Sequence, residues 1–332
     1  MSTNEKKPPV LELNHVDIGF YYNGRFSTIV HDANFTINEG ETVGLVGESG
    51  SGKTTIGRAI VRINKVHKGE IKFMGETISG KISRKIKREI PKNIQMVFQD
   101  PAASLNERAN VNYIIGEGIS NYPELYIPEG QEKKLTRKEK EKLKYEKVCE
   151  AIKSVGLLEE HLSRYPHEFS GGQRQRIGIA RSVVMKPKLI IADEPISALD
   201  VSIRAQVLNL LKDYQKSNNI SYLFIAHDLS VVRFISDKII VISKGRIVEM
   251  CEAETLFDLP LHPYTQSLLS AIPVPDPHVE KTREHIDYIP RKYTRDNLPT
   301  FEEVWPGHFV LGDKDEIANY RKIAENHYKN KK

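Results

Sequence analysis

Residues 47–54 of the chain read Gly47-Glu48-Ser49-Gly50-Ser51-Gly52-Lys53-Thr54. This stretch fits G-x-x-x-x-G-K-[ST], the pattern of a phosphate-binding loop. Its glycines let successive backbone N–H groups point into one concavity, and a following helix adds its positive end. We therefore expect Lys53 to reach the β- and γ-phosphates of a nucleotide and the Thr54 hydroxyl to bind Mg²⁺. A glycine-rich turn with an incidental lysine is the alternative.

The residues on either side of the loop favour the phosphate-binding interpretation. Residues 42–46 form a short apolar run, typical of a strand, and residues 54–63 have apolar side chains at helical spacing. Strand, glycine-rich loop and helix in this order are what a P-loop NTPase requires. Thr55, beside Thr54 at the start of the helix, is a further candidate for contact with the nucleotide.

A second element is Leu189-Ile190-Ile191-Ala192-Asp193-Glu194. Its apolar run predicts a buried strand with Asp193 at the carboxyl end, where ligands bind in open α/β sheets. We expect Asp193 to contact Mg²⁺, directly or through water, and Glu194 to polarise the attacking water. An apolar run before Asp-Glu is common by itself, but together with the loop it indicates a P-loop NTPase.

A third element, Ser170-Gly171-Gly172-Gln173, stands at the predicted start of a helix. A serine and two glycines there are typical of an anion site, although an ordinary N-cap with a flexible turn has the same residues. Its position favours the anion site, because it follows a helical stretch and shortly precedes the Asp193 strand.

The remaining pattern indicates an α/β fold. We predict strands at 11–20, 30–37, 69–78 with a turn near Gly75, 94–98, 222–226, and a hairpin at 238–243 and 245–250, with helices at 173–185, 201–214 and 230–235. Continuous apolar strands alternating with helices predict a parallel sheet covered on both faces. The expected fold class is therefore a P-loop NTPase (RecA-like) sheet domain.

The pattern changes twice along the chain. Helices and loops dominate between Gln99 and Ser170, which predicts a helical subdomain at about 100–170 inserted into an ATPase domain of residues 1–272. Within it, the Lys- and Glu-rich stretch 131–147 indicates a solvated helix, and the basic stretch 81–92 before it a solvated helix or loop. Prolines and charges are frequent beyond residue 273, so residues 273–332 are expected to form a C-terminal extension.

The composition excludes several classes of protein. No run of about 18 apolar residues is present, so no membrane span is expected, and the polar N-terminus does not resemble a secretory signal. Cys149 and Cys251 are too few for a disulfide framework or a four-cysteine metal site, which fits the reducing cytoplasm. The net charge of +5 suits an anionic membrane face or simple solubility, and is weak support for nucleic-acid binding.

In this order the elements resemble the nucleotide-binding subunits of ABC transporters, over about residues 11–270. Ser170 to Gln173 is similar to the family signature, with Phe169 before it where many members have leucine. Gln99 matches the glutamine of the Q-loop, Ser197-Ala198-Leu199-Asp200 the D-loop, and His227 the switch histidine.

The resemblance implies that two such subunits enclose two ATP molecules between them. Ser170 and Gly172 would contact the γ-phosphate bound on the partner, with Gly171, Gln173 and Asp200 in the same nucleotide-binding set. Gln99, Glu194 and His227 would be catalytic at the chain's own site, where Gln99 joins Thr54 and Asp193 at Mg²⁺. His227 has a structural role as its alternative. Tyr22 would stack on adenine, with Tyr21 and Phe26 as rivals.

Further segments resemble the ATPases of peptide importers within that family. These are Gln99-Asp100-Pro101 with Ser104-Leu105-Asn106, Arg164-Tyr165-Pro166-His167-Glu168-Phe169, His262-Pro263-Tyr264-Thr265-Gln266 and Pro306-Gly307-His308. There are two departures. Glu107 stands where many relatives have proline, and no cysteine follows Cys251, so the iron–sulfur centre that several relatives carry is not expected.

The resemblance therefore implies an ATPase that energises oligopeptide import from the cytoplasmic face of the cell membrane. It would pair with a second, OppD-like ATPase as a heterodimer, with two transmembrane permease subunits, and through them with an extracellular peptide-binding protein, but not with nucleic acid. Residues 99–106 and 164–169 would face the permease. The alternatives are an importer of nickel or another small solute, a soluble ABC-type ATPase, and a regulatory module that hydrolyses little ATP.

Overall fold

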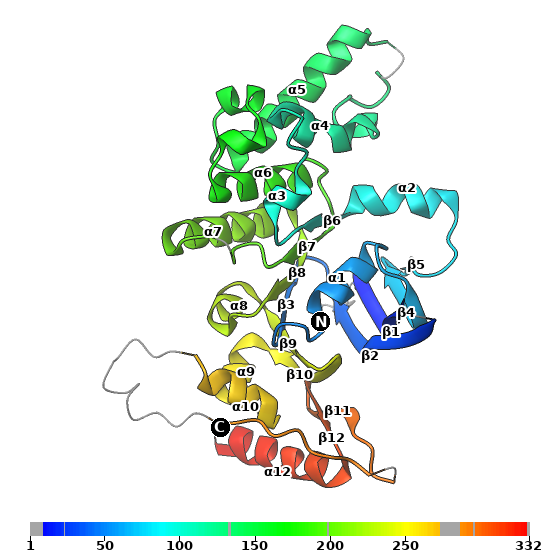
Figure 1. The fold of residues 1–332 in the computed structure, drawn as a ribbon, viewed down its shortest axis with the longest axis vertical. Coiled ribbons are helices and arrows are strands. Elements are labelled where there is room, and N and C mark those ends of the chain that lie inside the picture. The colour runs from blue at the N-terminus through cyan, green and yellow to red at the C-terminus, as the bar shows by residue number, and fades with distance from the viewer. Residues whose placement is uncertain are drawn as a thin grey trace, which may run out of the picture. The chain divides into compact units, whose positions relative to one another are not determined.

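The computed structural model describes residues 9–22, 24–131, 134–197, 199–272, 286–294 and 296–330 (Figure 1). The chain divides into two compact units. The first is built mainly from residues 81–223, and the second from residues 11–37, 41–80 and the described part of the chain after residue 223. Strand β8 (Ser221–Ala226) runs across the division, so each unit is described by itself.

An antiparallel sheet opens the second unit. Its strands are β1 (Leu11–Tyr22), β2 (Arg25–Ile37), β4 (Val66–Phe73) and β5 (Glu76–Thr77), in the order β2-β1-β4-β5. Leu13 of β1 pairs with Phe35 on one side and Ile71 on the other, and all three are buried. The turn predicted near Gly75 is confirmed, because Met74 and Gly75 both have left-handed φ angles and separate β4 from β5.

The second unit also contains a run of strands in the order β11-β12-β10-β9-β3. These are β11 (Thr300–Trp305), β12 (His308–Gly312), β10 (Arg246–Glu252), β9 (Lys238–Ser243) and β3 (Thr42–Val46). β3 and β9 are parallel and the other pairs antiparallel. Every residue of β3 is buried, as its apolar run predicts. The hairpin predicted for 238–250 is confirmed as β9 and β10.

Short helices accompany these strands. α1 (Lys53–Ile60) follows β3, and α8 (Leu229–Ile235) follows β8. α9 (Ala253–Asp258) and α10 (Pro263–Ser270) come after β10. The helix predicted at 54–63 therefore ends about one turn early, and a left-handed residue, Arg62, lies just beyond its end.

The chain after residue 296 is folded, although the sequence analysis assigned no strand or helix there. β11 and β12 extend the sheet, and α12 (Lys314–Asn330) lies against both strands (Figure 1). The helix contributes Ile317, Tyr320 and Ala324 to a buried cluster, which Leu259, Leu261, Val304 and Val310 complete. Trp305 stacks on Tyr328 at its edge, with ring centroids 4.7 Å apart. This part of the chain therefore packs on the unit through its own small core.

The first unit combines two parallel strands with a helical region. β6 (Ile94–Val97) pairs in parallel with β7 (Leu189–Asp193). The helices are α2 (Arg84–Asn93), α3 (Pro101–Ser104), α4 (Val111–Ser120), α5 (Arg137–Ser154), α6 (Gly171–Val183) and α7 (Val201–Asn218), with 3-10 turns η1 (Pro123–Leu125), η2 (Glu159–Ser163) and η3 (Pro166–Glu168). α4, α5 and α6 pack together through buried side chains such as Ile115, Ile152 and Ile177.

Two stretches that the sequence marked as solvated are helices. The basic stretch 81–92 forms α2, whose N-cap Ser83 accepts a hydrogen bond from the Ile86 amide. The stretch 131–147 becomes helical only at Arg137, because Thr136 forms a capping box with Glu139 at that point. The solvated helix expected in this stretch is confirmed as α5, and the capping pair was the signal that could have placed its start.

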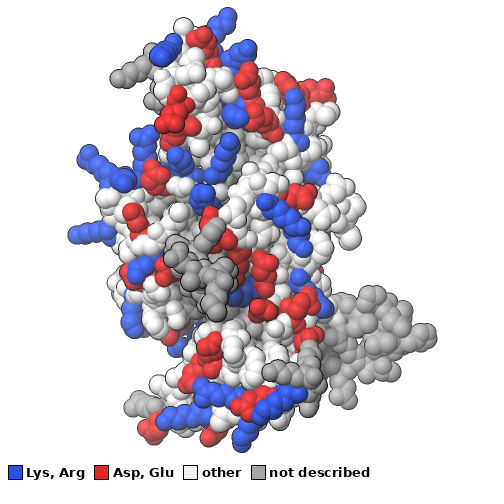
Figure 2. Space-filling view, turned by 180° about the vertical axis from the view of Figure 1, so that it is seen from behind, with Lys and Arg blue, Asp and Glu red and all other residues white. Residues whose placement is uncertain are grey.

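One face of the described chain is of mixed charge. Figure 2 shows one face, on which Lys and Arg side chains are interspersed with Asp and Glu, so that neither sign covers it. Within the described ranges, none of the helices has both the length and the apolar character that a membrane crossing requires.

Candidate nucleotide site

The phosphate-binding loop lies in the second unit, between the end of β3 and the start of α1. Lys53 is buried, and its Nζ donates hydrogen bonds to the carbonyl oxygens of Gly47 at 2.7 Å and Glu48 at 2.8 Å. The Ser51 amide donates to the Glu48 carbonyl oxygen at 3.2 Å. Ser49 and Gly50 in the middle of the loop are exposed, while Thr54 and Thr55 are half-buried. The loop therefore closes around its lysine, as a phosphate cradle requires.

The loop is tightly backed by the β9–β10 hairpin. A Cβ at Gly47 would lie 2.1 Å from the Ile242 carbonyl oxygen, so no larger residue fits there without displacing backbone. The Gly245 amide donates to the Ser51 carbonyl oxygen at 3.0 Å. By contrast, Gly50 has a φ of 78° and open space around it. Its backbone is therefore free to approach a phosphate closely.

Tyr264 is a support of the loop that the sequence analysis did not identify as one. This residue of α10 is buried, and its hydroxyl accepts a hydrogen bond from the Glu48 amide at 3.0 Å. Burial raises the pKa of Tyr264, so the phenol stays protonated at neutral pH. His262 fixes the start of α10, because its Nδ1 accepts from the Tyr264 amide. No local pattern could have found this contact, which joins residues 216 positions apart.

We expect Tyr264→Phe to lower the free energy of unfolding by about 1 kcal/mol, since the Glu48 amide loses its buried acceptor. Chemical denaturation of the whole chain measures the change. Tyr222→Phe is the matched control, because Tyr222 is equally buried but its hydroxyl has no hydrogen-bond partner among the described residues. Tyr222→Phe should leave the free energy of unfolding unchanged or raise it. Equal effects of the two substitutions would show that the Glu48 contact contributes nothing.

The aromatic residues considered for adenine lie at the β1–β2 turn in the same unit. Tyr21 is 75% exposed and packs on Phe26, with ring centroids 5.1 Å apart, and Phe26 in turn packs on His67 at 4.1 Å. Tyr22 ends β1 and pairs with Arg25 in the sheet, but its side chain lies outside the described part of the structure. Tyr22 as the stacking residue stays a prediction.

In the first unit, the structure brings Gln99 and Glu194 together. Asp193 is buried at the end of β7, and Glu194 follows it half-buried. The side-chain amide of Gln99 donates to Glu194 Oε2 at 3.0 Å. Glu194 has a φ of 46°, in the left-handed region that side chains other than glycine rarely adopt. Such strain is typical of functional positions.

The signature residues begin α6 in the same unit. Ser170 Oγ accepts from the Gln173 amide, and Gln173 Oε1 accepts from the Ser170 amide, so the pair forms a capping box. The N-cap that the sequence offered as the alternative is therefore present. The cap leaves Gly171 accessible, because there is open space where its Cβ would project, whereas a Cβ at Gly172 would lie 3.2 Å from the Ile203 side chain.

The signature and the D-loop share one cavity. Asp200 caps α7 by accepting from the Ile203 amide at 3.0 Å, while Ala198 lies outside the described residues. The cavity has a volume of about 700 Å³. It is lined by Gly156, Leu157, Leu158, His161, Ser170, Gly171, Gly172, Gln173, Arg176, Leu199, Asp200 and Ile203. Two motifs that are separate in the sequence thus face one space in the first unit.

The remaining predicted residue and segments are placed as follows. His227 is exposed just after β8, and Asp228 next to it caps α8 by accepting from the Ser230 amide. The segments 99–106 and 164–169 both lie in the first unit. There Glu107 lies 3.8 Å from His167, and Tyr165, which is 42% exposed, stacks on the His167 ring.

Comparison with known proteins identifies the family. A model described as "ABC transporter" matches residues 30–197, and one described as "Oligopeptide/dipeptide transporter, C-terminal region" matches residues 248–297. The chain belongs to the ABC transporter family. As an ABC transporter ATPase it binds ATP, and the expected P-loop NTPase fold class is confirmed.

Several curated ABC transporter relatives align with nearly the whole chain. The oligopeptide transport ATP-binding protein AmiF of Streptococcus pneumoniae is 55% identical over 94% of this chain and 98% of its own length. The oligopeptide transport ATP-binding protein OppF of Bacillus subtilis is 50% identical with the same coverage. The dipeptide transport ATP-binding protein DppF of Lactococcus lactis is 47% identical over 97% of this chain and 99% of its own.

Solved ABC transporter structures share the fold. The chain superposes on cbiO1 of Clostridium perfringens, part of the ABC transporter complex cbiONQ, with a TM-score of 0.62 and 28% identity, over 76% of this chain and 91% of that one. A dimeric bacterial ABC transporter cassette gives a TM-score of 0.63 and 25% identity, over 73% of this chain and 98% of that one.

Proposed function

We propose that this chain is the ATP-binding and ATP-hydrolysing subunit that energises import of oligopeptides, held at the cytoplasmic face of the cell membrane. One observation carries the substrate class. The chain joins an ABC ATPase domain to the C-terminal region of oligopeptide and dipeptide transporters. Oligopeptides are favoured over dipeptides because the relatives at 50–55% identity are named oligopeptide transport proteins, while the dipeptide relative stands at 47%.

The residues present fit ATP with Mg²⁺. Lys53 is already enclosed by the loop, and Gly47 to Thr55 offer backbone amides and two hydroxyls at a helix start. We propose that these residues hold the phosphates and that Tyr22 stacks on adenine. Thr54, Gln99 and Asp193 supply the oxygen ligands that Mg²⁺ prefers. Held by these residues, Mg²⁺ would neutralise charge on the phosphates.

We propose that hydrolysis is catalysed by residues that position the attacking water and accept its proton. The Glu194 carboxylate accepts the proton of the attacking water, and the Gln99 amide fixes that carboxylate through its Oε2. His227 completes the catalytic set. Little covalent chemistry is required of the protein, since positioning and electrostatics supply most of the rate.

The signature residues serve a second subunit in this proposal. Ser170, Gly171, Gly172, Gln173 and Asp200 line a cavity that is large enough for part of a nucleotide and holds none of the loop's phosphate-binding residues. We propose that they contact ATP held by the partner, an OppD-like ATPase, in a heterodimer. The complex adds two transmembrane permease subunits and, through them, an extracellular peptide-binding protein, and it contacts no nucleic acid.

We also propose how the chain is divided into domains. Residues 1–272 form the ATPase domain, with the helical subdomain at about 100–170, and residues 273–332 form the C-terminal extension. The exposed Tyr165–His167 stack and the neighbouring Glu107 mark a surface for the permease subunits. Exposed tyrosine is typical of a protein–protein contact surface.

Mg·ATPase activity tests the proposal, measured on the purified chain alone and after assembly with the neighbouring ATPase and permease subunits. We expect weak activity alone and at least a tenfold rise in the complex. Ser170→Ala should remove most of that rise. Thr136→Ala is the matched control, because it also removes the N-cap serine or threonine of a capping box but lies far along the chain from the signature. Full activity in the isolated chain, unaffected by partners, would overturn the proposal.

A further inference from the structure

A second cavity lies within the second unit, between the β9–β10 hairpin and the C-terminal extension. Its volume is about 420 Å³, within the range of pockets that hold small organic ligands. The hairpin contributes Ser243, Lys244 and Arg246, and the extension contributes Tyr288, Arg291 and Tyr293 among others. None of these residues belongs to the nucleotide site described above.

The lining of this cavity combines apolar side chains with positively charged ones. Aromatic and aliphatic walls come from Tyr288, Leu298 and Leu311, of which Leu298 is 64% exposed. Among the described residues, the same space is lined by Lys244, Arg246 and Arg291 and by no aspartate or glutamate. An apolar wall with a few placed charges is what fixes the orientation of a small ligand in a binding site.

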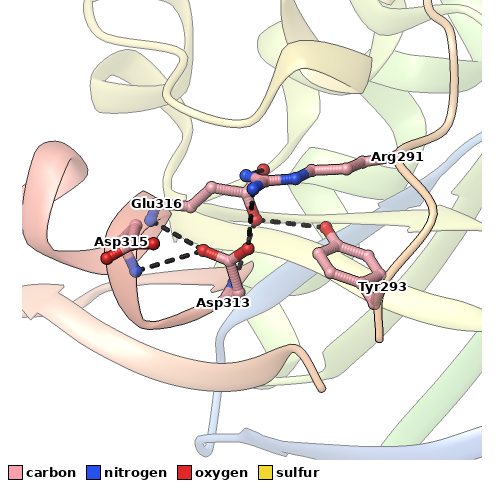
Figure 3. A network of polar contacts seen from close by, with 5 residues as sticks. All are labelled: Arg291, Tyr293, Asp313, Asp315 and Glu316. Carbon is pink, nitrogen blue, oxygen red and sulfur yellow. Dashed lines mark hydrogen bonds and ion pairs between the residues drawn. The ribbon is translucent and has the colours of Figure 1, made fainter. Parts of the chain in front are cut away.

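Arg291 forms part of the fixed wall. Figure 3 shows its guanidinium between Asp313 and Glu316, with ion pairs of 3.1 Å to each. The Tyr293 hydroxyl donates to Glu316 Oε2 at 3.2 Å from the other side. Asp313 is almost fully buried and caps α12. The charge of Arg291 is therefore matched, and its position is held by the helix start.

Lys244 and Arg246 differ from Arg291. Both are exposed, and neither forms an ion pair with any described residue. They flank Gly245, so the hairpin turn places the two cations at the cavity together. Among the lining residues that the structure describes, Lys244 and Arg246 are thus the lysine and arginine without an acidic partner.

We propose that this cavity binds a small organic anion with an aromatic or aliphatic body and one carboxylate or phosphate group. Lys244 and Arg246 hold the anionic group through charge-assisted hydrogen bonds. The apolar body packs on Tyr288 and Leu298, which removes its surface from water.

The cavity is connected to the phosphate-binding loop by two contacts. Tyr288 packs edge-on against Tyr264 with ring centroids 5.2 Å apart, and the Tyr264 hydroxyl accepts from the Glu48 amide. Gly245, between the two cations, donates to the Ser51 carbonyl oxygen. Occupation of the cavity therefore changes the affinity for ATP. This link rests on the proposed role of the loop, whereas binding of the anion does not.

Binding is tested with 8-anilinonaphthalene-1-sulfonate, an aromatic anion, by fluorescence on the full chain carrying Glu194→Gln and saturated with Mg·ATP, so that the nucleotide site is filled. Phenyl phosphate and phenylacetate should displace the probe, and uncharged phenylacetamide should not. Comparison of the two anions shows which acidic group the site prefers. Displacement by the amide as effective as by the acids would overturn recognition of the charge.

Variants locate the site. Lys244→Ala with Arg246→Ala should weaken probe binding at least tenfold. Arg321→Ala with Lys322→Ala is the matched control, because it removes two exposed basic residues from α12 outside the cavity and should change binding less than twofold. Equal losses in the two double variants would overturn the assignment.

The link is tested by ATP affinity of the chain with and without saturating phenyl phosphate. We expect at least a threefold change that disappears in the Lys244 and Arg246 double variant, with a reciprocal effect of ATP on the anion. An unchanged ATP affinity while the anion binds would overturn the link. A chain that binds no ATP at all would instead overturn the proposed function, and the probe experiment would then be read without ATP.

Discussion

Glu194→Gln is expected to lower the ATPase rate of the assembled transporter at least about 100-fold while ATP binding is retained, the usual scale for losing a positioned proton acceptor. The amide keeps the shape of the carboxylate but cannot accept the proton of the attacking water. Gln99 remains beside it, because the 3.0 Å contact to Glu194 Oε2 can be made with the amide oxygen. ATP should therefore accumulate on the protein and hold the two ATPase subunits together.

Single-turnover hydrolysis and ATP binding, measured separately, check this expectation. Glu146→Gln is the matched control, because Glu146 is an exposed glutamate of α5 whose nearest cation, Lys142, is 4.0 Å away. It should leave both quantities unchanged. Turnover of Glu194→Gln equal to that of the control would rule out the proton-accepting role of Glu194, and loss of ATP binding would point to a structural role.

Glu249→Ala is expected to lower the free energy of unfolding by about 3–5 kcal/mol, because each buried polar group left without its hydrogen-bond acceptor costs about 1–3 kcal/mol. Glu249 is fully buried in β10, and its Oε1 lies 2.8 Å from His308 Nε2. The same carboxylate accepts hydrogen bonds from the amides of Leu261 and His262, which lead into α10. Its removal leaves three buried polar groups without an acceptor.

Denaturant unfolding of the whole chain measures the loss. Glu302→Ala is the control, because Glu302 pairs with Arg321 at a similar 2.8 Å but the side chains are 41% and 50% exposed. Such a pair contributes about 0–1 kcal/mol. A double-mutant cycle of Glu249→Ala with His308→Ala should show a coupling of about 0.5–3 kcal/mol. Equal destabilisation by Glu249→Ala and Glu302→Ala would show that the buried pair is not important for stability.

The helix and strands of the C-terminal extension could not be predicted from sequence patterns. Ile317, Tyr320 and Ala324 follow helical spacing in α12, so a signal was present, but charged residues surround it and the stripe is narrow. β11 has two glutamates among its six residues, so its sequence only weakly indicates a strand. The core that stabilises both is completed by Leu259 and Leu261, far earlier in the chain. The helix by itself supplies only Ile317, Tyr320 and Ala324, so its sequence does not show the core on which it packs.

The sequence by itself determined the fold class, and it predicted which residues form the nucleotide site. The loop from Gly47 to Thr54 and the strand ending at Asp193 are each continuous in the chain, and backbone geometry and burial act over a few residues. Only the tertiary structure decided what holds these motifs in place. Tyr264 reaches Glu48 across 216 positions, and His308 reaches Glu249 across 59. Contacts of that length depend on how whole elements pack, because a hydrogen bond needs its two atoms within about 3 Å and no periodicity along the chain encodes that distance.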